Sequence, residues 1–290
     1  MSALGVTTLG EPLLLGAVAY DPKVVTIWEG FRRHFADHGL DFDLVLYTSY
    51  ERQVAAQLAG HVHVAWSSPL AWLQTERAAA ARGRRAEAIA MRDTDRDLTS
   101  VIVVRADAPA KALEDLRGKR IGVGAADSPQ ATLLPLWHLA QAGLDPTRDV
   151  EVVRHDRLVG KHGDHIGGER EAAAALVDGQ VDAACLIDGN HLAFAKDGTL
   201  PPGRTRVLAQ TAPYDHCNFT VLDGPPDARV ARFRELLLAM RYDDPAVRPL
   251  MDMEGLKQWV PGRVEGYRDL AAAIDRFGTI TPFLAELAAR

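Results

Sequence analysis

Short apolar runs alternate with longer amphipathic stretches along most of this chain, and this order constrains the fold more than any other feature. Leu13–Val18 has the length and composition of a buried strand, and 22–38 places Val25, Trp28 and Phe35 on one helical face. Strands that alternate with helices are typical of mainly parallel sheets covered by helices on both faces. The chain is therefore expected to be an α/β protein.

The alternation falls into two sets of strands. Strands are expected at 13–18, 42–47, 62–66, 88–91, 99–105, 120–123, 150–153, 183–187, 206–209 and 218–222. Helices are expected at 22–38, 51–59, 69–82, 129–142, 170–176, 228–240, 245–251 and 267–277. The stretches 99–105 and 210–221 pass from one set to the other, so we predict two lobes with a cleft between them. Lobe 1 comprises 1–98 and 211–290, and lobe 2 comprises 99–210.

Length and charge exclude several classes of protein. With 290 residues, the chain is long enough for two domains that each bury a core. Its net charge is −6 and it has no long basic run, so nucleic acid is not an expected partner. The short cluster Arg82–Arg85 is interpreted as a solvated helix end. No apolar stretch approaches the roughly 20 residues that span a bilayer.

The N-terminus and the cysteines bear on location. The chain enters its first strand without the basic and apolar regions of an export signal. A cytoplasmic location is therefore expected for the sequence as given, and a periplasmic or extracellular one if a leader has been trimmed. Cys185 and Cys217 are too few for a disulfide framework and lack the spacing of zinc ligands.

Several strand-to-helix turns carry helix-capping residues. Asp21-Pro22, Ser68-Pro69 and Ser128-Pro129 each place a capping side chain before proline, and 48–51 resembles a capping box. One such cap can simply begin a helix. In an open α/β sheet, however, these turns gather at the carboxyl ends of the strands, where ligands bind and helix N-termini attract anions. The turns therefore favour a ligand site in the cleft.

Four segments carry a family resemblance. They are AYDPKVVTIWEGFRRHF, SYERQVAAQLAGHVHVAWSSPLAW, LRGKRIGVGAADSPQATLLPL and EREAAAALVDGQVDAA. Together they resemble the phosphate-, phosphite- and phosphonate-binding components of ABC transporters, from about residue 14 to residue 222. The resemblance implies a type II periplasmic-binding-protein-like fold whose lobes close by a hinge on a small polar ligand. It also implies an ABC permease as partner if the protein is exported.

The resemblance also suggests which residues bind the ligand. Where the family has a Ser-Thr-Ser stretch, this chain has Ser128-Pro129-Gln130, and Glu169 aligns with an anion-binding histidine of the family. The family tyrosine is retained as Tyr50, and Asp188 and Asp215 correspond to carboxylates that hold a ligand amine. The full expected set is Tyr20, Asp21, Tyr50, Ser67, Ser68, Asp127, Ser128, Glu169, Asp188 and Asp215.

These departures change the expected ligand. A carboxylate that faces a phosphonate dianion adds repulsion, and the loss of two hydroxyls and an imidazole removes hydrogen bonds to an anion. A simple phosphonate is therefore not expected to bind well. A zwitterion, a cation-bearing solute or a metal-bound acid fits the residues better.

Histidine and cysteine residues allow further interpretations. His155, His162 and His165 lie in a polar stretch and are candidates for metal ligands, although a surface loop is the simpler interpretation. In 214–218, His216 and Cys217 would point to opposite sides if the segment were a strand, so a contact between them is not expected. Cys185 is assigned to the core.

Two functions of different class remain open. The first is a solute-binding protein. The second is a cytoplasmic enzyme on the same fold, of lyase or dehydratase, desulfinase or cofactor-biosynthesis type, with Cys217, His216, His165 and Glu169 as candidate catalytic residues. Binding is preferred because no catalytic pattern is specific. The sequence assigns no cofactor.

Overall fold

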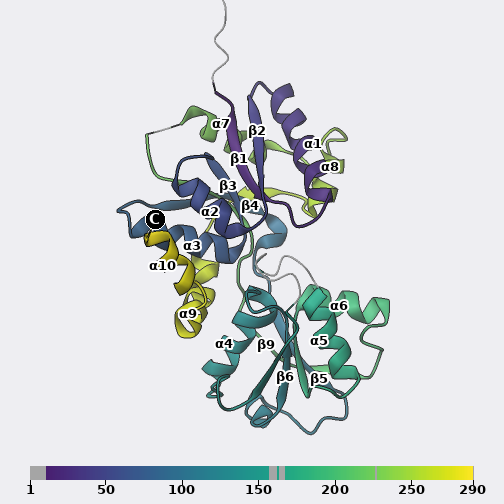
Figure 1. The fold of residues 1–290 in the computed structure, drawn as a ribbon. Coiled ribbons are helices and arrows are strands. Elements are labelled where there is room, and N and C mark those ends of the chain that lie inside the picture. Colours follow the sequence, from purple (N-terminus) through teal and green to yellow (C-terminus); the bar gives the residue numbers. More distant parts are fainter. Residues whose placement is uncertain (1–10, 157–161, 163–166, 226, 290) are drawn as a thin grey trace, which may run out of the picture.

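The computed structural model describes residues 11–156, 162, 167–225 and 227–289, which form two sheets, each flanked by helices (Figure 1). Across the first sheet the strands are β11 (Trp259–Pro261), β4 (Ala86–Arg92), β10 (Asn218–Leu222), β3 (Val64–Ser67), β1 (Leu13–Val18) and β2 (Phe42–Tyr47). Across the second they are β7 (Glu151–Arg154), β6 (Arg120–Val123), β8 (Ala183–Ile187), β5 (Ser100–Arg105) and β9 (Thr205–Gln210). We use lobe 1 and lobe 2 for these sheets with their helices; the predicted boundaries at 98/99 and 210/211 stay a prediction.

Most strands of each sheet share one direction. In lobe 1, β2, β1 and β3 are parallel neighbours, and β10 runs against both β3 and β4. In lobe 2, β7, β6 and β8 are parallel neighbours, and β5 runs against both β8 and β9. The short edge strand β11 also runs against β4, and the reversed strands β5 and β10 are the first strands after each crossing between the lobes. The expected α/β fold with mainly parallel strands is confirmed.

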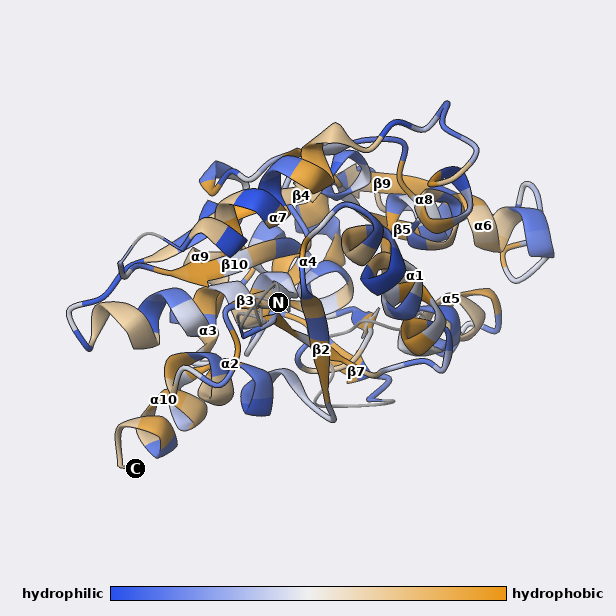
Figure 2. Ribbon diagram, turned by 90° about the horizontal axis from the view of Figure 1, so that it is seen from above, coloured by the Kyte–Doolittle hydropathy of each residue, from blue (hydrophilic) through white to orange (hydrophobic). Residues whose placement is uncertain are grey.

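Helices cover the sheets on both sides. In lobe 1 they are α1 (Lys23–Asp37), α2 (Tyr50–Leu58), α3 (Pro69–Ala80), α7 (Ala228–Ala239), α8 (Arg248–Glu254), α9 (Arg268–Phe277) and α10 (Thr281–Ala288). In lobe 2 they are α4 (Leu134–Gln141), α5 (Gly167–Val177) and α6 (Asp188–Asp197). In the view of Figure 2, β5 and β10 are largely hydrophobic, whereas α1 carries both hydrophilic and hydrophobic residues. Among the described helices, none is long and apolar enough to cross a membrane.

Aromatic side chains dominate the core of lobe 1. Trp28 and Phe35 of α1 are buried and pack toward Phe219 and Phe233, in agreement with the expected helix face. Val25 does not belong to that face and is 47% exposed. The helix begins at Lys23, and its buried stripe runs through Val24, Ile27, Trp28, Phe31 and Phe35.

The two lobes also meet through an apolar cluster beside the connecting segments. Leu133 and Leu134 of lobe 2 pack in one cluster with Trp72 of α3 and Ile274 of α9. The connecting segments 93–99 and 211–217 pair where Leu98 and Tyr214 exchange backbone hydrogen bonds of 2.9 and 2.8 Å, and His216 N donates to the backbone oxygen of Asp95 over 2.8 Å. Both segments are therefore fixed to each other at the junction between the lobes.

Candidate functional site

The carboxyl ends of parallel strands from both sheets meet at the junction between the lobes, as expected for a ligand site in an α/β fold. From lobe 1 come the starts of α2 and α3, after β2 and β3. From lobe 2 come the residues after β6 and the start of α5. The predicted caps are present: Ser49, Ser68 and Ser128 accept hydrogen bonds from the backbone N–H groups of Arg52, Ala71 and Ala131.

His162 of lobe 2 reaches across to lobe 1. Its ring stacks on Tyr50, with centroids 4.6 Å apart and planes 15° apart. Its Nδ1 lies 2.7 Å from Ser68 Oγ, and its Nε2 lies 2.9 Å from Glu51 Oε1. We call Tyr50, Glu51 and Ser68 the lobe 1 wall. Each of these residues has His162 as a partner.

The backbone of His162 is also held in place. Its φ of +50° is unusual for a residue with a side chain. Its N–H donates to Asp127 Oδ2 over 3.0 Å, which fixes this conformation against the residues after β6. Burial alone would raise the pKa of Glu51, but the hydrogen bond and charge of His162 bring it below its ordinary value of 4.5.

We call Glu169 and Thr132, which both lie close to Gly124, the lobe 2 wall. A Cβ atom at Gly124 would lie 3.9 Å from Glu169 Cγ and 3.8 Å from Thr132 Oγ1. A Cβ at Gly168 would lie 2.5 Å from the carbonyl oxygen of His155 and 3.2 Å from Gly124 Cα. Two glycines therefore let the first turn of α5 approach the end of β6 and bring Glu169 to the junction.

Both residues of the lobe 2 wall have a buried polar atom without a hydrogen-bond partner among the described residues. Glu169 is 2% exposed, and its Oε2 accepts hydrogen bonds from Ile187 N and Asn190 Nδ2, each over 3.0 Å. Its Oε1 is buried without a hydrogen-bond partner among the described residues, and so is Thr132 Oγ1. Such atoms destabilise a protein unless something donates to them or accepts from them.

Burial raises the pKa of Glu169 to about 7, and the hydrogen bonds from Asn190 and Ile187 and the charge of His216 offset part of that rise. Burial likewise raises the pKa of Cys185 to about 12 and holds that of Tyr214 well above 10, so both neighbours are neutral near pH 7. His216 belongs to the segment that leads back into lobe 1. Glu169 thus faces the connecting segments as well as its own lobe.

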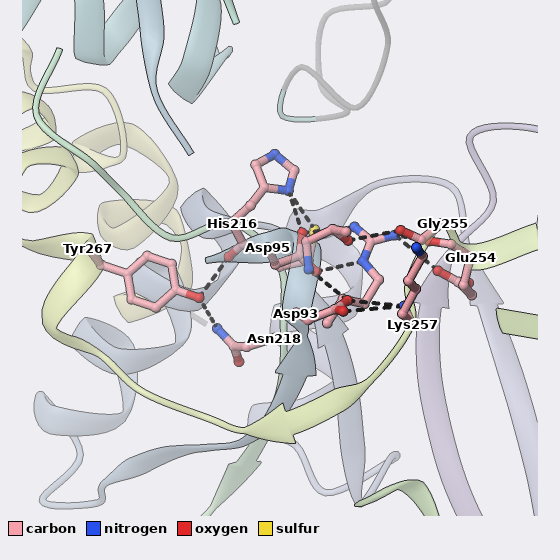
Figure 3. Close-up of polar contacts among 11 residues, drawn as sticks. Asp93, Asp95, His216, Asn218, Glu254, Gly255, Lys257 and Tyr267 are labelled. Atoms are coloured by element: carbon pink, nitrogen blue, oxygen red, sulfur yellow. Dashed lines mark hydrogen bonds and ion pairs between the residues drawn. The ribbon is translucent and has the colours of Figure 1, made fainter. Parts of the chain in front are cut away.

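A third group of side chains lies on the connecting segments (Figure 3). Cys217 Sγ is 3.1 Å from His216 Nδ1, and that nitrogen is 3.4 Å from Asp95 Oδ1. Arg92 donates to both oxygens of Asp95 and to Glu254. The expectation that His216 and Cys217 point apart was wrong, because both precede β10 and are not in extended strand geometry.

The other predicted ligand residues of lobe 1 lie close to this junction in different settings. Tyr20 is half-buried beneath Lys23, and Asp21 is exposed and caps α1 through the Lys23 N–H. Ser67 is buried and accepts a hydrogen bond from Thr220 between β3 and β10. Their contact with a ligand stays a prediction.

Asp188 and Asp215, the predicted partners of a ligand amine, both have protein partners. Asp188 accepts from Thr99 Oγ1 over 2.7 Å at the start of α6. Asp215 is 1% exposed, and both its oxygens accept from Arg263. Asp215 therefore holds the connecting segment against Arg263. Compared with Asp188 and Asp215, Glu169 is therefore the better candidate to bind a ligand amine.

The predicted metal ligands are not brought together. His155 Nδ1 lies 3.9 Å from Glu171 Oε2, and His162 binds the lobe 1 wall. His165 lies outside the described residues. Among the described residues, the His, Cys and acidic groups that could hold a metal are instead Asp95, His216 and Cys217.

Sequence reasoning missed Glu51, Asp95, Thr132 and Asn190. Glu51 lies in the first turn of a helix and Asp95 ends a short 3-10 helix at Asp93–Asp95, and nothing in their local sequence distinguishes them from solvated acids. The glycines at 124 and 168 were the available signal, because each sits where a strand or loop meets a helix.

Comparisons with known proteins agree on the fold. A family model described as the phosphonate ABC transporter periplasmic substrate-binding protein matches residues 17–267. PhnD1 from Prochlorococcus marinus, solved in complex with methylphosphonate, is 17% identical with a TM-score of 0.66, covering 92% of this chain and 98% of that one. XAC2383 from Xanthomonas citri, solved with ATP, is 20% identical with a TM-score of 0.67, covering 91% and 97%.

A third similar structure is the periplasmic aliphatic sulphonate binding protein SsuA from Escherichia coli. It is 16% identical with a TM-score of 0.56, covering 94% of this chain and 87% of that one. A search of curated proteins found no match. The predicted two-lobed fold of type II binding proteins is thereby confirmed.

Proposed function

This chain belongs to the phosphonate-binding periplasmic components of ABC transporters, and from that premise we propose that it closes its lobes on a small zwitterionic solute. The observation that carries the ligand class is the buried Oε1 of Glu169, which lacks a hydrogen-bond donor among the described residues. A ligand ammonium group supplies that donor and a compensating charge. A charge-assisted bond of this kind contributes about 1.5–3 kcal/mol.

The acidic group of the solute is assigned to the lobe 1 wall. Helices α2 and α3 both begin there, and helix N-termini favour anions. The Ser68 hydroxyl and the His162 ring can donate to an acidic oxygen once they exchange their mutual hydrogen bond for the ligand. Glu51, Asp127 and Glu169 lie at the same junction, so a dianion without an ammonium group meets net repulsion.

A permease of the ABC type is the partner that the family implies, and the family is periplasmic. The expectation of a cytoplasmic location therefore finds no support, and the alternative of a cytoplasmic enzyme finds none either. We propose that the natural gene product acts outside the cytoplasm. Fractionation of cells that express the natural gene tests this: recovery in the cytosol alone would contradict it.

Calorimetry with aminoethylphosphonate, methylphosphonate and phosphate tests the ligand class. The ammonium-bearing compound is expected to bind most tightly. Glu169→Gln is expected to weaken that compound by about 10–100-fold and to spare or improve methylphosphonate. Glu171→Gln, the same change on the same helix at a more exposed position, is the control and is expected to leave both affinities unchanged.

The pH dependence gives an independent test of the same contact. Ionised Glu169 attracts an ammonium group, so affinity is expected to rise with pH through about 7. A protonated Glu169 that donated to an acidic oxygen would give the opposite slope. Tighter binding of methylphosphonate than of aminoethylphosphonate, with affinity that falls as pH rises, would contradict the proposal.

A further inference from the structure

Asp95, His216 and Cys217 bring three different metal-ligating atoms together where the two connecting segments meet lobe 1. The imidazole Nδ1, the thiol Sγ and a carboxylate oxygen all lie within 4.8 Å of one another. Asp95 is 2% exposed and Cys217 is 4% exposed, whereas His216 is half-buried. His216 is more exposed than Asp95, and in Figure 3 its ring lies at the edge of the group with Nδ1 directed toward the other ligands.

The two distances from His216 Nδ1 are close to those around a tetrahedral metal. Zinc bonds of 2.0–2.3 Å to nitrogen, oxygen and sulfur place neighbouring ligand atoms about 3.3–3.6 Å apart. The Nδ1–Oδ1 distance is 3.4 Å, and the Nδ1–Sγ distance of 3.1 Å needs only a small shift. A single N–H on Nδ1 cannot serve both the sulfur and the carboxylate well, whereas a metal ion between them satisfies all three atoms.

The surrounding charges also balance a divalent ion. Asp95 and Glu254 are carboxyl groups, and Cys217 would bind as a thiolate, while Arg92 carries one positive charge. With both carboxyls ionised, three negative charges and one positive charge leave a net charge of −2. Arg92 uses one lone pair of each Asp95 oxygen, so Oδ1 keeps a lone pair for a metal.

Neighbouring groups fix the ligands in position. Arg92 holds the carboxylate of Asp95 through two hydrogen bonds of 2.6 and 2.9 Å. Tyr267 donates to the backbone oxygen of His216 over 2.7 Å and accepts from Asn218 Nδ2 over 2.9 Å. Such outer partners orient the ligands of metal sites.

We propose that Asp95, His216 and Cys217 form a binding site for a divalent metal of the zinc type, with its fourth position open on the His216 side. Thiolate and imidazole ligands favour zinc-like ions over magnesium or calcium. Because the three ligands come from both connecting segments, a bound ion would tie these segments together at the end of lobe 1. The site stands independently of which solute the lobes enclose.

Untagged protein, titrated with ZnCl₂ and separately with CoCl₂, tests the site. One equivalent of Zn²⁺ is expected to bind, and Co²⁺ is expected to show the near-ultraviolet charge-transfer band of a thiolate ligand. Cys217→Ser is expected to abolish the band and weaken Zn²⁺ at least about 10-fold. Cys185→Ser, at the other thiol, and His155→Ala, at a histidine outside the cluster, are the controls and are expected to change neither.

The spectrum of Co²⁺-loaded wild-type protein tests whether Cys217 is a metal ligand even if a variant fails to fold. Cys185 lies in the core of lobe 2 on β8, so a thiolate band in the folded protein reports Cys217. Absence of stoichiometric Zn²⁺ binding would overturn the proposal. Co²⁺ binding without the band, or Zn²⁺ affinity unchanged in folded Cys217→Ser, would overturn it as well.

Discussion

The two walls of the junction differ in how far their polar groups are satisfied. On lobe 1, Tyr50, Glu51 and Ser68 all contact the single imidazole of His162. On lobe 2, Glu169 and Thr132 are buried, and each keeps one oxygen without a partner among the described residues. On lobe 1 a protein group occupies the place proposed for the acidic group of the ligand, whereas on lobe 2 no described residue pairs with the buried oxygens.

This difference indicates which wall contributes most to the binding free energy of a solute. On lobe 1 a ligand exchanges one hydrogen bond for another, so the net gain there is small. On lobe 2 it removes the desolvation penalty of buried oxygens, which is about 1–3 kcal/mol for each group. Binding energy and specificity are therefore expected to come mainly from lobe 2.

The largest change is expected in how the stability of Glu169→Gln depends on pH. A pKa of about 7 in the folded protein, against 4.5 for an ordinary glutamate, means that the folded state binds the proton more tightly. Protonated Glu169 therefore contributes its full stabilisation below about pH 4.5. The free energy of unfolding falls as pH rises toward 7, by about 3 kcal/mol in all. The variant is expected to lose this pH dependence and to exceed the wild type near pH 8.

Denaturant unfolding at several pH values measures this effect. Glu171→Gln on the same helix is the control and is expected to follow the wild-type curve. A Glu169→Gln variant with the same pH profile as the wild type would show that Glu169 is solvated, and the contrast between the walls would fail.

A smaller effect is expected for Thr132→Val. The change keeps the shape and removes the unpartnered hydroxyl, so the ligand-free protein should gain about 1 kcal/mol of stability. If the hydroxyl contacts the solute, affinity should fall at the same time. Thr75→Val is a matched control because Thr75 Oγ1 in α3 is also buried without a partner among the described residues.

Thr75→Val should therefore gain similar stability and leave affinity unchanged. Thermal melts and calorimetry on both variants separate the two effects. Equal affinity in Thr132→Val and the wild type would remove Thr132 from the ligand contacts and leave Glu169 alone on the lobe 2 wall.

Five strands could be predicted to the residue, and the bounds of the other predicted strands lie within two residues of the prediction. Leu13–Val18, Phe42–Tyr47, Arg120–Val123, Ala183–Ile187 and Asn218–Leu222 have the predicted bounds, because turn residues limit each run. The helices α6 and α10 and the short edge strand β11 were not predicted, since α6 and β11 have no clear apolar period and α10 is only 8 residues long. The helix expected at 129–142 begins instead with a π-helical turn at Pro129–Leu133.

The site was less predictable because its contacts join distant residues. His162 and Glu51 are 111 residues apart in the sequence, and no local pattern indicates that they meet. His216 and Cys217 are neighbours, but whether they point the same way depends on where β10 begins. Glu169 could be singled out only by comparison with the family, since burial of a carboxylate is a tertiary property.

The smallest change in stability is expected for Glu51→Gln, and its pH dependence is expected to be opposite to that of Glu169→Gln. The pKa of Glu51 lies below 4.5 because of His162, so its stabilisation is present above about pH 4.5 and is lost as pH falls through the folded pKa. Its side chain is 34% exposed, which limits the effect to a few tenths of a kcal/mol. The two glutamates thus respond oppositely to acid: low pH weakens the Glu51–His162 contact on lobe 1 and removes the cost of burying a charged Glu169 on lobe 2.

In denaturant unfolding, Glu51→Gln should lower stability slightly at neutral pH and not at acid pH, with exposed Glu29→Gln on α1 as control. A Glu51→Gln variant that exceeded the wild type in stability near pH 8, as expected for Glu169→Gln, would show that the two walls are alike.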